Sequence, residues 1–463
     1  MNTEKKIVIL GAGISGLTTA YILRKDGFNV TILEKNGQAG GTMESTRIDG
    51  YLFDKGPNSG LETTPLIGEL VRELHIEGEF IYGSPEASKR YILRNNQLHP
   101  LPMTPGAFLK TKLFTPQAKA RLFAEPLIGR SRDGYYQSIA DFVKRRLGSE
   151  FLDYAINPFI AGVYAGDPKQ LSVKSALPKL YALEEKYGGL MIGTVRSYKE
   201  RKKRAEKAKA SAKMFSFKNG MQELPLALAD SLKENIVNEA EVISVRKNDI
   251  DYTVTYNLSG EAKEIQTPVV LSAMPAYHAA KVFAELDGKL TEHLNAVYYP
   301  PVIVLYLVYN KKDIGQPLDG FGFLVPQVEK KSFLGALWSS VIFPDRTSED
   351  KTALTVFVGG SRDPEIEKYD KELLYKRVKN ELHEIMQITA EPVLTTERFW
   401  KKSIPQYNIG YIEHERYFSQ FEENFPGLYL GGNYRGGISV GDCIKNSDNL
   451  AQKIIGSVKK VSY

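Results

Sequence analysis

The sequence predicts an α/β fold, α+β overall, in which a nucleotide-binding domain built from separate segments joins a mixed β-sheet domain and a helical lobe. Two glycine-rich stretches support this class. Residues 5–10 form a short apolar strand that runs into G-x-G-x-x-G and a helix, and residues 427–431 form a second strand that runs into glycines before a final helix. Strand, glycine turn and helix in this order are typical of Rossmann-type domains. Because more than 400 residues separate the two stretches, we expect the C-terminus to fold back onto one discontinuous site; the alternative is an independent glycine-rich loop.

The first turn has the residue types that binding a pyrophosphate requires. Gly11 closes the turn, Gly13 lets the backbone approach the phosphates, and Gly16 lets the helix pack on the strand. The N-terminus of the following helix offers free N–H groups and the positive end of its dipole. The predicted phosphate-binding residues are Gly11, Ala12, Gly13, Ile14, Ser15 and Gly16.

An acidic residue and a glycine pair narrow the choice of nucleotide. Glu34, followed by Lys35, ends the second predicted strand and lies 18 positions after Gly16, where a carboxylate can accept hydrogen bonds from ribose hydroxyls. Gly40 and Gly41 follow six residues later. A glycine pair at this point is typical of FAD enzymes of the amine-oxidase type rather than of NAD domains, so FAD is the predicted cofactor.

The bulk composition excludes several other classes of protein. The 463 residues include one cysteine, Cys443, and six scattered histidines, so we expect neither disulfides nor a metal site. The longest apolar run, residues 302–308, is too short to cross a bilayer. A net charge of +6 is too small to indicate nucleic-acid binding. The chain enters its first strand with no room for a leader, which favours a cytoplasmic protein.

Changes in composition along the chain predict five segments. Residues 1–80 form the first FAD-binding segment, and residues 81–213 form a helical lobe. Residues 214–289 form the second FAD-binding segment, 290–410 the substrate domain, and 411–463 the third FAD-binding segment. In the first segment, residues 44–53 read as a hairpin around Asp49 and Gly50. Gly56, Pro57, Asn58 and Ser59 then form either a simple turn or a lining for the isoalloxazine ring.

Two basic features of the predicted helical lobe have more than one interpretation. Arg90 begins a strand and shares a face with Ile92 and Arg94. It could bind a carboxylate or lie on the surface as a solvated side chain. The lysine- and arginine-rich residues 196–213 fit a solvated loop or frayed helix better than a contact with anionic lipid headgroups.

Several longer motifs have no general explanation as flavoprotein features. They include residues 89–92, 157–168, 220–222, 320–326, 343–346, 357–362 and 432–441. With the two glycine turns, these stretches resemble the oxygen-dependent protoporphyrinogen oxidases of plants and bacteria over nearly the whole chain. The resemblance implies FAD, an amine-oxidase-like fold and a helical lobe that contacts membranes.

The resemblance also implies roles for individual residues. Arg90 matches the arginine that anchors a substrate propionate, Leu324 and Leu337 an aliphatic clamp, and Phe357 an aromatic that stacks on the tetrapyrrole. Asn58 matches a polar residue near the reacting centre, and Val242 a residue whose backbone meets the adenine. The residues expected near the flavin ring are Asn433, Ile438, Ser439 and Val440.

The expected activity is oxidation of protoporphyrinogen IX to protoporphyrin IX by FAD and O2, with H2O2 as by-product, in heme biosynthesis. Coproporphyrinogen III is the alternative substrate, and a flavin-bound tetrapyrrole scaffold without turnover is the alternative from another class. The resemblance leaves open a peripheral contact with the inner face of the cell membrane, a homodimer, and hand-over of the product to a chelatase.

Overall fold

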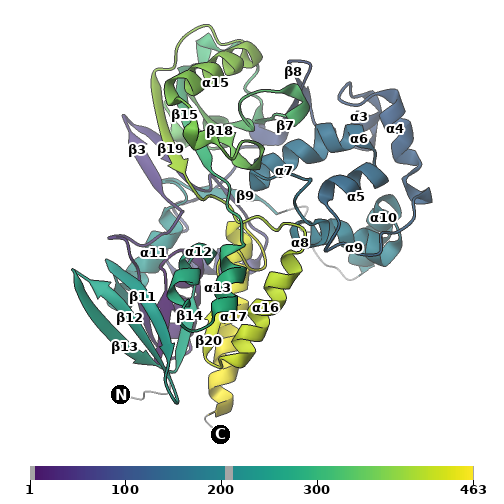
Figure 1. Cartoon of the computed structure of the whole chain (residues 1–463). Coiled ribbons are helices and arrows are strands. Elements are labelled where there is room, and N and C mark those ends of the chain that lie inside the picture. The colour runs from purple at the N-terminus through teal and green to yellow at the C-terminus, as the bar shows by residue number, and fades with distance from the viewer. Residues whose placement is uncertain (1–5, 204–211, 462–463) are drawn as a thin grey trace.

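A five-stranded parallel sheet is assembled from three distant parts of the chain, as Figure 1 shows near the two termini. The computed structural model describes residues 6–203 and 212–461. The strand order is β10–β2–β1–β14–β20, and every neighbouring pair is parallel. The strands are β1 (Lys6–Leu10), β2 (Asn29–Leu33), β10 (Ile236–Val237), β14 (Val269–Ser272) and β20 (Leu428–Leu430). The predicted return of the C-terminal segment to the N-terminal part is confirmed, because β20 joins the sheet of β1 by pairing with β14.

Strand β1 is apolar throughout because both faces of this sheet are covered. Ile7 and Ile9 pack into a core with helices α1 (Ile14–Lys25) and α17 (Val440–Val461). Val8 and Leu10 pack into a second core on the other face, which also contains side chains of the antiparallel sheet β11–β12–β13. Two-sided burial is the usual reason for a parallel strand without polar alternation.

A second, seven-stranded sheet forms the predicted substrate domain. Its order is β19–β15–β18–β17–β16–β7–β8, and only β16 and β7 pair in parallel. Helix α15 (Lys371–Met386) covers one face and shares a core with it. The strands are β7 (Lys89–Arg94), β8 (Gln97–Pro100), β15 (Val302–Asn310), β16 (Gly320–Leu324), β17 (Gly335–Trp338), β18 (Lys351–Gly359) and β19 (Leu394–Trp400).

This sheet corrects one predicted boundary. Residues 89–100 were assigned to the helical lobe with the rest of 81–213, but they form β7 and β8 at the edge of the substrate sheet. The pairing of Arg90 with Gly322 joins residues more than 200 positions apart. Local composition does not encode such a pairing, because the partner strand lies outside any window around residue 90.

The helical lobe lies beside the substrate sheet (Figure 1). Thr104 and Thr115 cap its first two helices, and a proline follows each of them at the first helical position, a favoured combination. Arg146 is fully buried and bonds to the carboxylates of Glu125 (2.8 Å) and Glu184 (2.6 Å). The lobe contains α3 (Pro105–Lys110), α4 (Pro116–Phe123), α5 (Ile139–Arg146), a π-helical turn (Leu152–Ile156), α7 (Asn157–Tyr164), α8 (Val173–Ala176), α9 (Pro178–Tyr187) and α10 (Leu190–Lys203).

The remaining elements connect these parts. The predicted hairpin is confirmed: β3 (Ser45–Ile48) pairs with β4 (Tyr51–Asp54), with positive φ at Asp49 and Gly50. A small sheet pairs β9 with β5 and β6. These elements are β5 (Gly60–Leu61), β6 (Phe80–Tyr82), β9 (Met214–Phe217), β11 (Ala240–Lys247), β12 (Tyr252–Leu258), β13 (Glu261–Thr267), α2 (Pro65–Glu73), α11 (Glu223–Ser231), α12 (Ala276–Val282), α13 (Gly288–Asn295), α14 (Ser339–Ile342) and α16 (Tyr411–Asn424).

One predicted strand ends early, and one basic stretch is described only in part. The apolar pattern of residues 334–342 predicts one strand, but residues 339–342 form the short helix α14 after β17. The basic stretch 196–213 begins as the end of α10, and its residues 204–211 lie outside the described part of the chain. Among the described helices, none is long and apolar enough to cross a membrane.

Candidate functional site

Close backbone packing determines the shape of the first glycine turn. The amide of Gly11 donates to the carbonyl of Leu33 (2.9 Å), and Gly11 has φ +100°. A Cβ at Gly16 would lie 2.0 Å from the carbonyl oxygen of Gly11, a distance that any side chain would violate. Helix α1 can therefore approach strand β1 only with glycine at position 16, which is the packing role predicted for the third glycine.

The predicted glycine pair packs against this turn. The amide of Gly40 donates to the carbonyl of Ala12 (2.9 Å). Gly41 has φ +61°, and a Cβ there would lie 3.0 Å from Cα of Gly13. The two glycine segments thus form one continuous backbone surface without side chains, and a phosphate chain can approach it closely.

The predicted ribose-binding residue is buried beside the first glycine turn. Glu34 is buried and accepts hydrogen bonds from the amides of Ala12 (2.8 Å) and Asn36 (2.9 Å). Its carbonyl accepts from the amide of Ala240, which begins β11 (2.8 Å). Val242 follows on β11, just before an irregularity in its pairing with β12. The predicted ribose and adenine residues are therefore neighbours, whereas the Lys35 side chain is exposed.

The N-terminus of α1 fits an external phosphate. Within residues 6–203 and 212–461, no side chain caps α1 and no acidic residue lies in its first turn. By contrast, α2, on the same side of the sheet, is capped by the Thr64 hydroxyl. An uncapped helix start above a glycine turn is a site for an anion.

The C-terminal glycine loop meets the first turn through two helices. The Ser447 hydroxyl on α17 donates to the carbonyl of Ser15 on α1 (3.0 Å), and the Thr19 hydroxyl lies 3.4 Å from the carbonyl of Ser447. Of the predicted flavin residues, Ser439 accepts a hydrogen bond from the amide of Asp442 (3.1 Å) at the start of α17, and Val440 is buried. Asn433 is held through its carbonyl by the hydroxyl of Tyr407 (2.7 Å).

The four predicted substrate residues on the large sheet lie on one face. The register pairs Arg90 with Gly322 and Gly322 with Leu337, which forms one row across three strands. The next row on that face contains Leu324, Gly335 and Phe357. Side chains two positions apart on a strand point the same way.

Exposure separates this face from the one that α15 covers. Leu324, Leu337 and Phe357 are each only partly buried, whereas their strand neighbours Phe323 and Trp338 are 1–2% exposed in the core beneath α15. Large apolar side chains left partly open in two adjacent rows form a surface suited to a flat apolar ligand.

A small cavity joins this face to the nucleotide-binding part. Asn58 and Ser59 line it together with Leu337 and Thr355. Gly56 is confined to glycine because a Cβ there would lie 1.9 Å from the carbonyl oxygen of Thr42, and Pro57 lies between this contact and the cavity. The predicted isoalloxazine-lining segment and the predicted substrate clamp therefore face each other.

A buried ion pair, which no local sequence pattern predicts, lines the same cavity. Arg346 donates to the carboxylate of Asp54 (3.0 Å), to the hydroxyl of Ser216 (2.7 Å) and to the carbonyl of Phe217 (3.1 Å). Burial raises the pKa of Asp54 and lowers that of Arg346. The pair links the predicted substrate domain to two of the predicted FAD-binding segments. The motif 343–346 contains Arg346, but its partners come from two other parts of the chain.

Arg90 lies at the open edge of this surface. Its guanidinium carbon is 5.3 Å from the centre of the Phe321 ring, and its side chain is exposed. In the described part of the chain no carboxylate pairs with it, whereas the adjacent Lys89 pairs with Asp319. Arg90 thus remains available for an external anion.

The helical lobe closes one side of the surface. A Cβ at Gly162 on α7 would lie 2.5 Å from a methyl group of Leu324, so the helix backbone contacts the predicted clamp directly. Tyr164 at the end of α7 donates its hydroxyl to the carbonyl of Ala176 (2.8 Å), and burial raises its pKa to about 12. This hydroxyl is bound within the lobe and does not enter the clamp.

Comparisons with known proteins define the class. Residues 14–455 match the family of flavin-containing amine oxidoreductases. The chain belongs to this family, and the glycine turns, Glu34 and the uncapped helix α1 fit its FAD cofactor. It is an oxidoreductase, and the family resemblance found from the sequence is confirmed.

Full-length relatives narrow the comparison. The chain is 31% identical to protoporphyrinogen oxidase 2 of Arabidopsis thaliana, with 99% of this chain and 95% of that protein covered. It is 27% identical to coproporphyrinogen III oxidase of Bacillus subtilis, with 95% and 96% covered. A crystal structure of an Exiguobacterium protein superposes with a TM-score of 0.79 at 22% identity, covering 97% of this chain and 98% of that one, and supports the fold.

Proposed function

We propose that this chain oxidises protoporphyrinogen IX to protoporphyrin IX, with O2 as the electron acceptor and H2O2 as by-product, in heme biosynthesis. The observation that carries the proposal is the open sheet face with Arg90, Leu324, Leu337 and Phe357. This face adjoins the cavity that Asn58 and Ser59 line. A flat, apolar, carboxylate-bearing macrocycle matches this arrangement in shape and charge.

The side chains of this face position the substrate. When bound, FAD accepts electrons from the substrate and passes them to O2 in repeated cycles. Leu324 and Leu337 would pack on the macrocycle and Phe357 would stack on it, each contributing roughly 1.5–3 kcal/mol if fully covered. Arg90 would bind a propionate, and Asn58 would lie near the reacting carbon. Positioning is the protein's main contribution in such cofactor chemistry.

Replacing Arg90 by alanine tests the anchor. We expect Arg90→Ala to raise KM for protoporphyrinogen by about 10-fold or more, the loss of roughly 1.5–3 kcal/mol from a charge-assisted hydrogen bond. Reoxidation of the reduced flavin by O2 should change little. Steady-state and stopped-flow kinetics measure the two effects separately.

The neighbouring Lys89 provides a matched control. Lys89→Ala removes the same charge one residue away, but Lys89 already pairs with Asp319. Lys89→Ala should leave KM within about 2-fold, since exposed ion pairs contribute little. An unchanged KM in Arg90→Ala, or equal effects in both variants, would remove Arg90 from this role.

The choice between two porphyrinogens needs a direct test. Anaerobic mixing of the FAD-loaded protein with protoporphyrinogen IX or with coproporphyrinogen III should bleach the flavin absorbance. We expect faster bleaching by protoporphyrinogen IX, because in the described part of the chain Arg90 beside Phe321 pairs with no carboxylate at the edge of the clamp. Faster bleaching by coproporphyrinogen III would assign the activity of the Bacillus relative instead. Bleaching by neither would support a scaffold without turnover.

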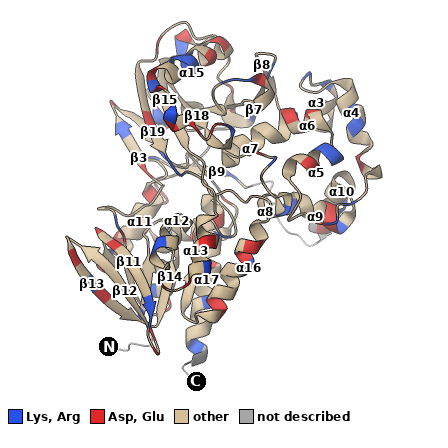
Figure 2. Ribbon diagram, viewed as in Figure 1, with Lys and Arg blue, Asp and Glu red and all other residues tan. Residues whose placement is uncertain are grey.

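We also propose a peripheral membrane contact through the helical lobe. Met103, Leu109, Phe123 and Leu127 are 60–88% exposed on this lobe, and Figure 2 shows basic residues on α4 and α5 of the same lobe. Apolar side chains next to basic ones suit an anionic bilayer surface. Co-sedimentation with anionic but not neutral vesicles would support this contact if the double variant Phe123→Ser, Leu127→Ser loses it.

The homodimer and the hand-over of the product to a chelatase stay predictions.

A further inference from the structure

The loop 433–437 needs hydrogen-bond partners from other parts of the chain. It follows β20 and leads into α17, and its two glycines, Gly436 and Gly437, have φ values of +78° and +139°. Such backbone conformations disfavour regular hydrogen-bond ladders, so partners outside the loop must bind its polar groups. The residues that supply these hydrogen bonds therefore hold the loop in place beside the predicted flavin site.

One hydroxyl bridges the two ends of this loop. Tyr407 donates its hydroxyl proton to the carbonyl of Asn433 (2.7 Å), and the same oxygen accepts a hydrogen bond from the amide of Gly437 (3.0 Å). The side chain is 5% exposed, and burial holds its pKa well above the ordinary value. The hydroxyl therefore keeps its proton and serves as donor and acceptor together.

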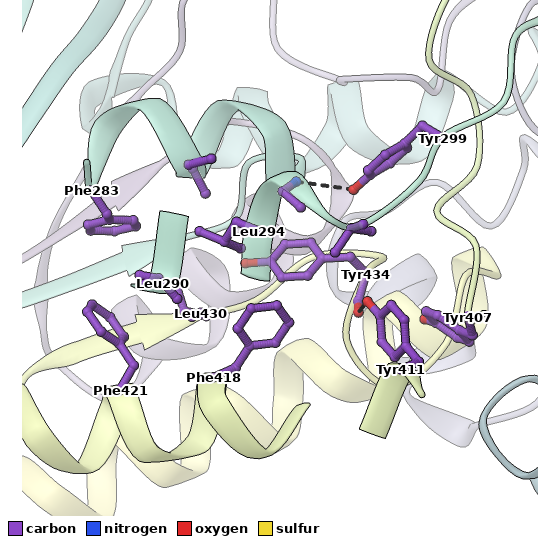
Figure 3. Close-up of a cluster of buried hydrophobic side chains, with 14 of the residues drawn as sticks. Phe283, Leu290, Leu294, Tyr299, Tyr407, Tyr411, Phe418, Phe421, Leu430 and Tyr434 are labelled. Atoms are coloured by element: carbon purple, nitrogen blue, oxygen red, sulfur yellow. Dashed lines mark hydrogen bonds between the residues drawn. The ribbon is translucent and has the colours of Figure 1, made fainter. Parts of the chain in front are cut away.

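Neighbouring side chains fix the rest of the loop around this bridge. Figure 3 shows Tyr407 and Tyr411 side by side below Tyr434, and their ring centres are 4.7 Å apart. Tyr411 donates to the carbonyl of Tyr434, and the Asn446 amide donates to the carbonyl of Arg435 (3.1 Å). Of these contacts, only the Tyr407 hydroxyl reaches both the first and the last residue of the loop.

The segment that contains Tyr407 is bonded to the helical lobe. We call residues 403–410 the strap. The carbonyl of Tyr407 accepts from the amide of Ser172 (2.9 Å), and the amide of Ile409 donates to the carbonyl of Gln170 (2.8 Å). Gln406 is 1% exposed and donates to the carbonyl of Tyr164 at the end of α7 (2.7 Å). Tyr407 thus joins two parts of the molecule. Its carbonyl binds the helical lobe, and its hydroxyl binds the loop 433–437.

We propose that Tyr407 is a positioning residue that fixes the loop 433–437 against the flavin and couples it to the helical lobe through the strap. The inference rests on the proposed FAD-dependent function, in which Asn433 and residues 438–440 at the two ends of this loop are predicted to lie near the flavin ring. It makes Tyr407 a determinant of FAD affinity rather than of porphyrinogen binding.

Tyr407→Phe tests the bridge in the full-length protein. The ring and its packing remain, and the loop loses two hydrogen bonds. We expect the FAD dissociation constant, measured by quenching of flavin fluorescence without any porphyrinogen, to rise on the order of 10-fold. The visible spectrum of the bound flavin should lose fine structure, because the loop no longer excludes water from the ring.

A matched control comes from the same nucleotide-binding part. Tyr252 is 2% exposed and also donates its hydroxyl to a backbone carbonyl, that of Pro426 (2.8 Å), but away from the loop. Tyr252→Phe should lower global stability while FAD affinity stays within about 2-fold of the wild type. Wild-type FAD affinity in Tyr407→Phe, or the same loss of affinity in both variants, would overturn the proposal.

Hydrogen exchange of the wild-type protein keeps the proposal testable if Tyr407→Phe does not fold. Adding FAD should protect peptides of the loop and of the strap together. Protection of the loop alone would overturn the coupling, and protection of neither would show that residues 433–440 do not face FAD. Because no porphyrinogen is present, a failure of the proposed substrate leaves this outcome unaffected.

Discussion

The two glycine-rich turns of the nucleotide site are held in opposite ways. The N-terminal turn is shaped mainly by backbone contacts between close neighbours, of which the approach of Gly16 to the carbonyl of Gly11 is the tightest, although the Glu34 carboxylate also binds the amide of Ala12. The C-terminal loop is shaped by side chains, namely the hydroxyls of Tyr407 and Tyr411 and the amide of Asn446. Two similar glycine-rich sequence patterns therefore owe their shapes to different interactions: steric contacts in the first turn and side-chain hydrogen bonds in the second.

This difference predicts how each turn responds to substitution. A sterically determined turn tolerates no added atom, however small, because a backbone oxygen cannot move away as a flexible side chain can. A hydrogen-bonded loop loses one contact at a time, and each contact contributes only about 0.5–1.5 kcal/mol net. We therefore expect larger effects from the first turn than from the second.

Gly16→Ala should have the largest effect. The new Cβ would lie 2.0 Å from the carbonyl oxygen of Gly11, and such overpacking costs about 1–3 kcal/mol or more. The purified variant should lose most of its FAD, because α1 must move away from β1. Flavin content per protein and urea unfolding measure both effects.

Gly456→Ala is the matched control for that variant. Gly456 lies within α17, and a Cβ there would have nothing within 4 Å. Alanine is favoured over glycine inside a helix by about 0.5–1 kcal/mol, so this variant should be slightly more stable and keep its FAD. Full FAD content in Gly16→Ala would contradict the steric account of the first turn.

Tyr411→Phe should have an intermediate effect. It removes the hydroxyl that donates to the carbonyl of Tyr434 in a buried site, which costs about 0.5–1.5 kcal/mol of unfolding free energy. Denaturation in urea with FAD present measures it. Tyr136→Phe, at a 51% exposed tyrosine, should change stability by less than about 0.5 kcal/mol. Equal values for the two variants would show that the loop does not depend on this contact.

The alkylation rate of Cys443 tests, without any substitution, whether the C-terminal loop encloses the thiol. Burial raises the pKa of Cys443 to about 11, and its thiol lies 3.9 Å from the carbonyl of Gly437. A raised pKa means less thiolate at pH 8, so alkylation of the folded protein should be on the order of 100-fold slower than that of the unfolded chain. The rate should rise about tenfold per pH unit toward pH 11.

This labelling is specific because the sequence contains one cysteine. Removing FAD should accelerate alkylation if the loop opens without its cofactor. Equally fast alkylation of the folded and unfolded protein at pH 8 would show that the loop does not enclose the thiol.

On the predicted substrate face, the sequence indicated the individual residues but not the long-range contacts that bring them together. Resemblance named Arg90, Leu324, Leu337 and Phe357, and the register places all four in two adjacent rows of one face. Their roles stay predictions until tested. The membership of β7 in that sheet and the Asp54–Arg346 pair were missed, since both depend on partners more than 100 residues away.

Local chemistry explains what the sequence determined by itself. The apolar strand, the glycine spacing and Glu34 act over a few tens of residues, so their pattern predicted the nucleotide turn, its FAD preference and the fold class. Tertiary structure alone decided which distant hydroxyl bridges the second loop and which strand brings Arg90 to the clamp. Such contacts have no signal in a local window, because they arise only when strands, strap and lobe pack together.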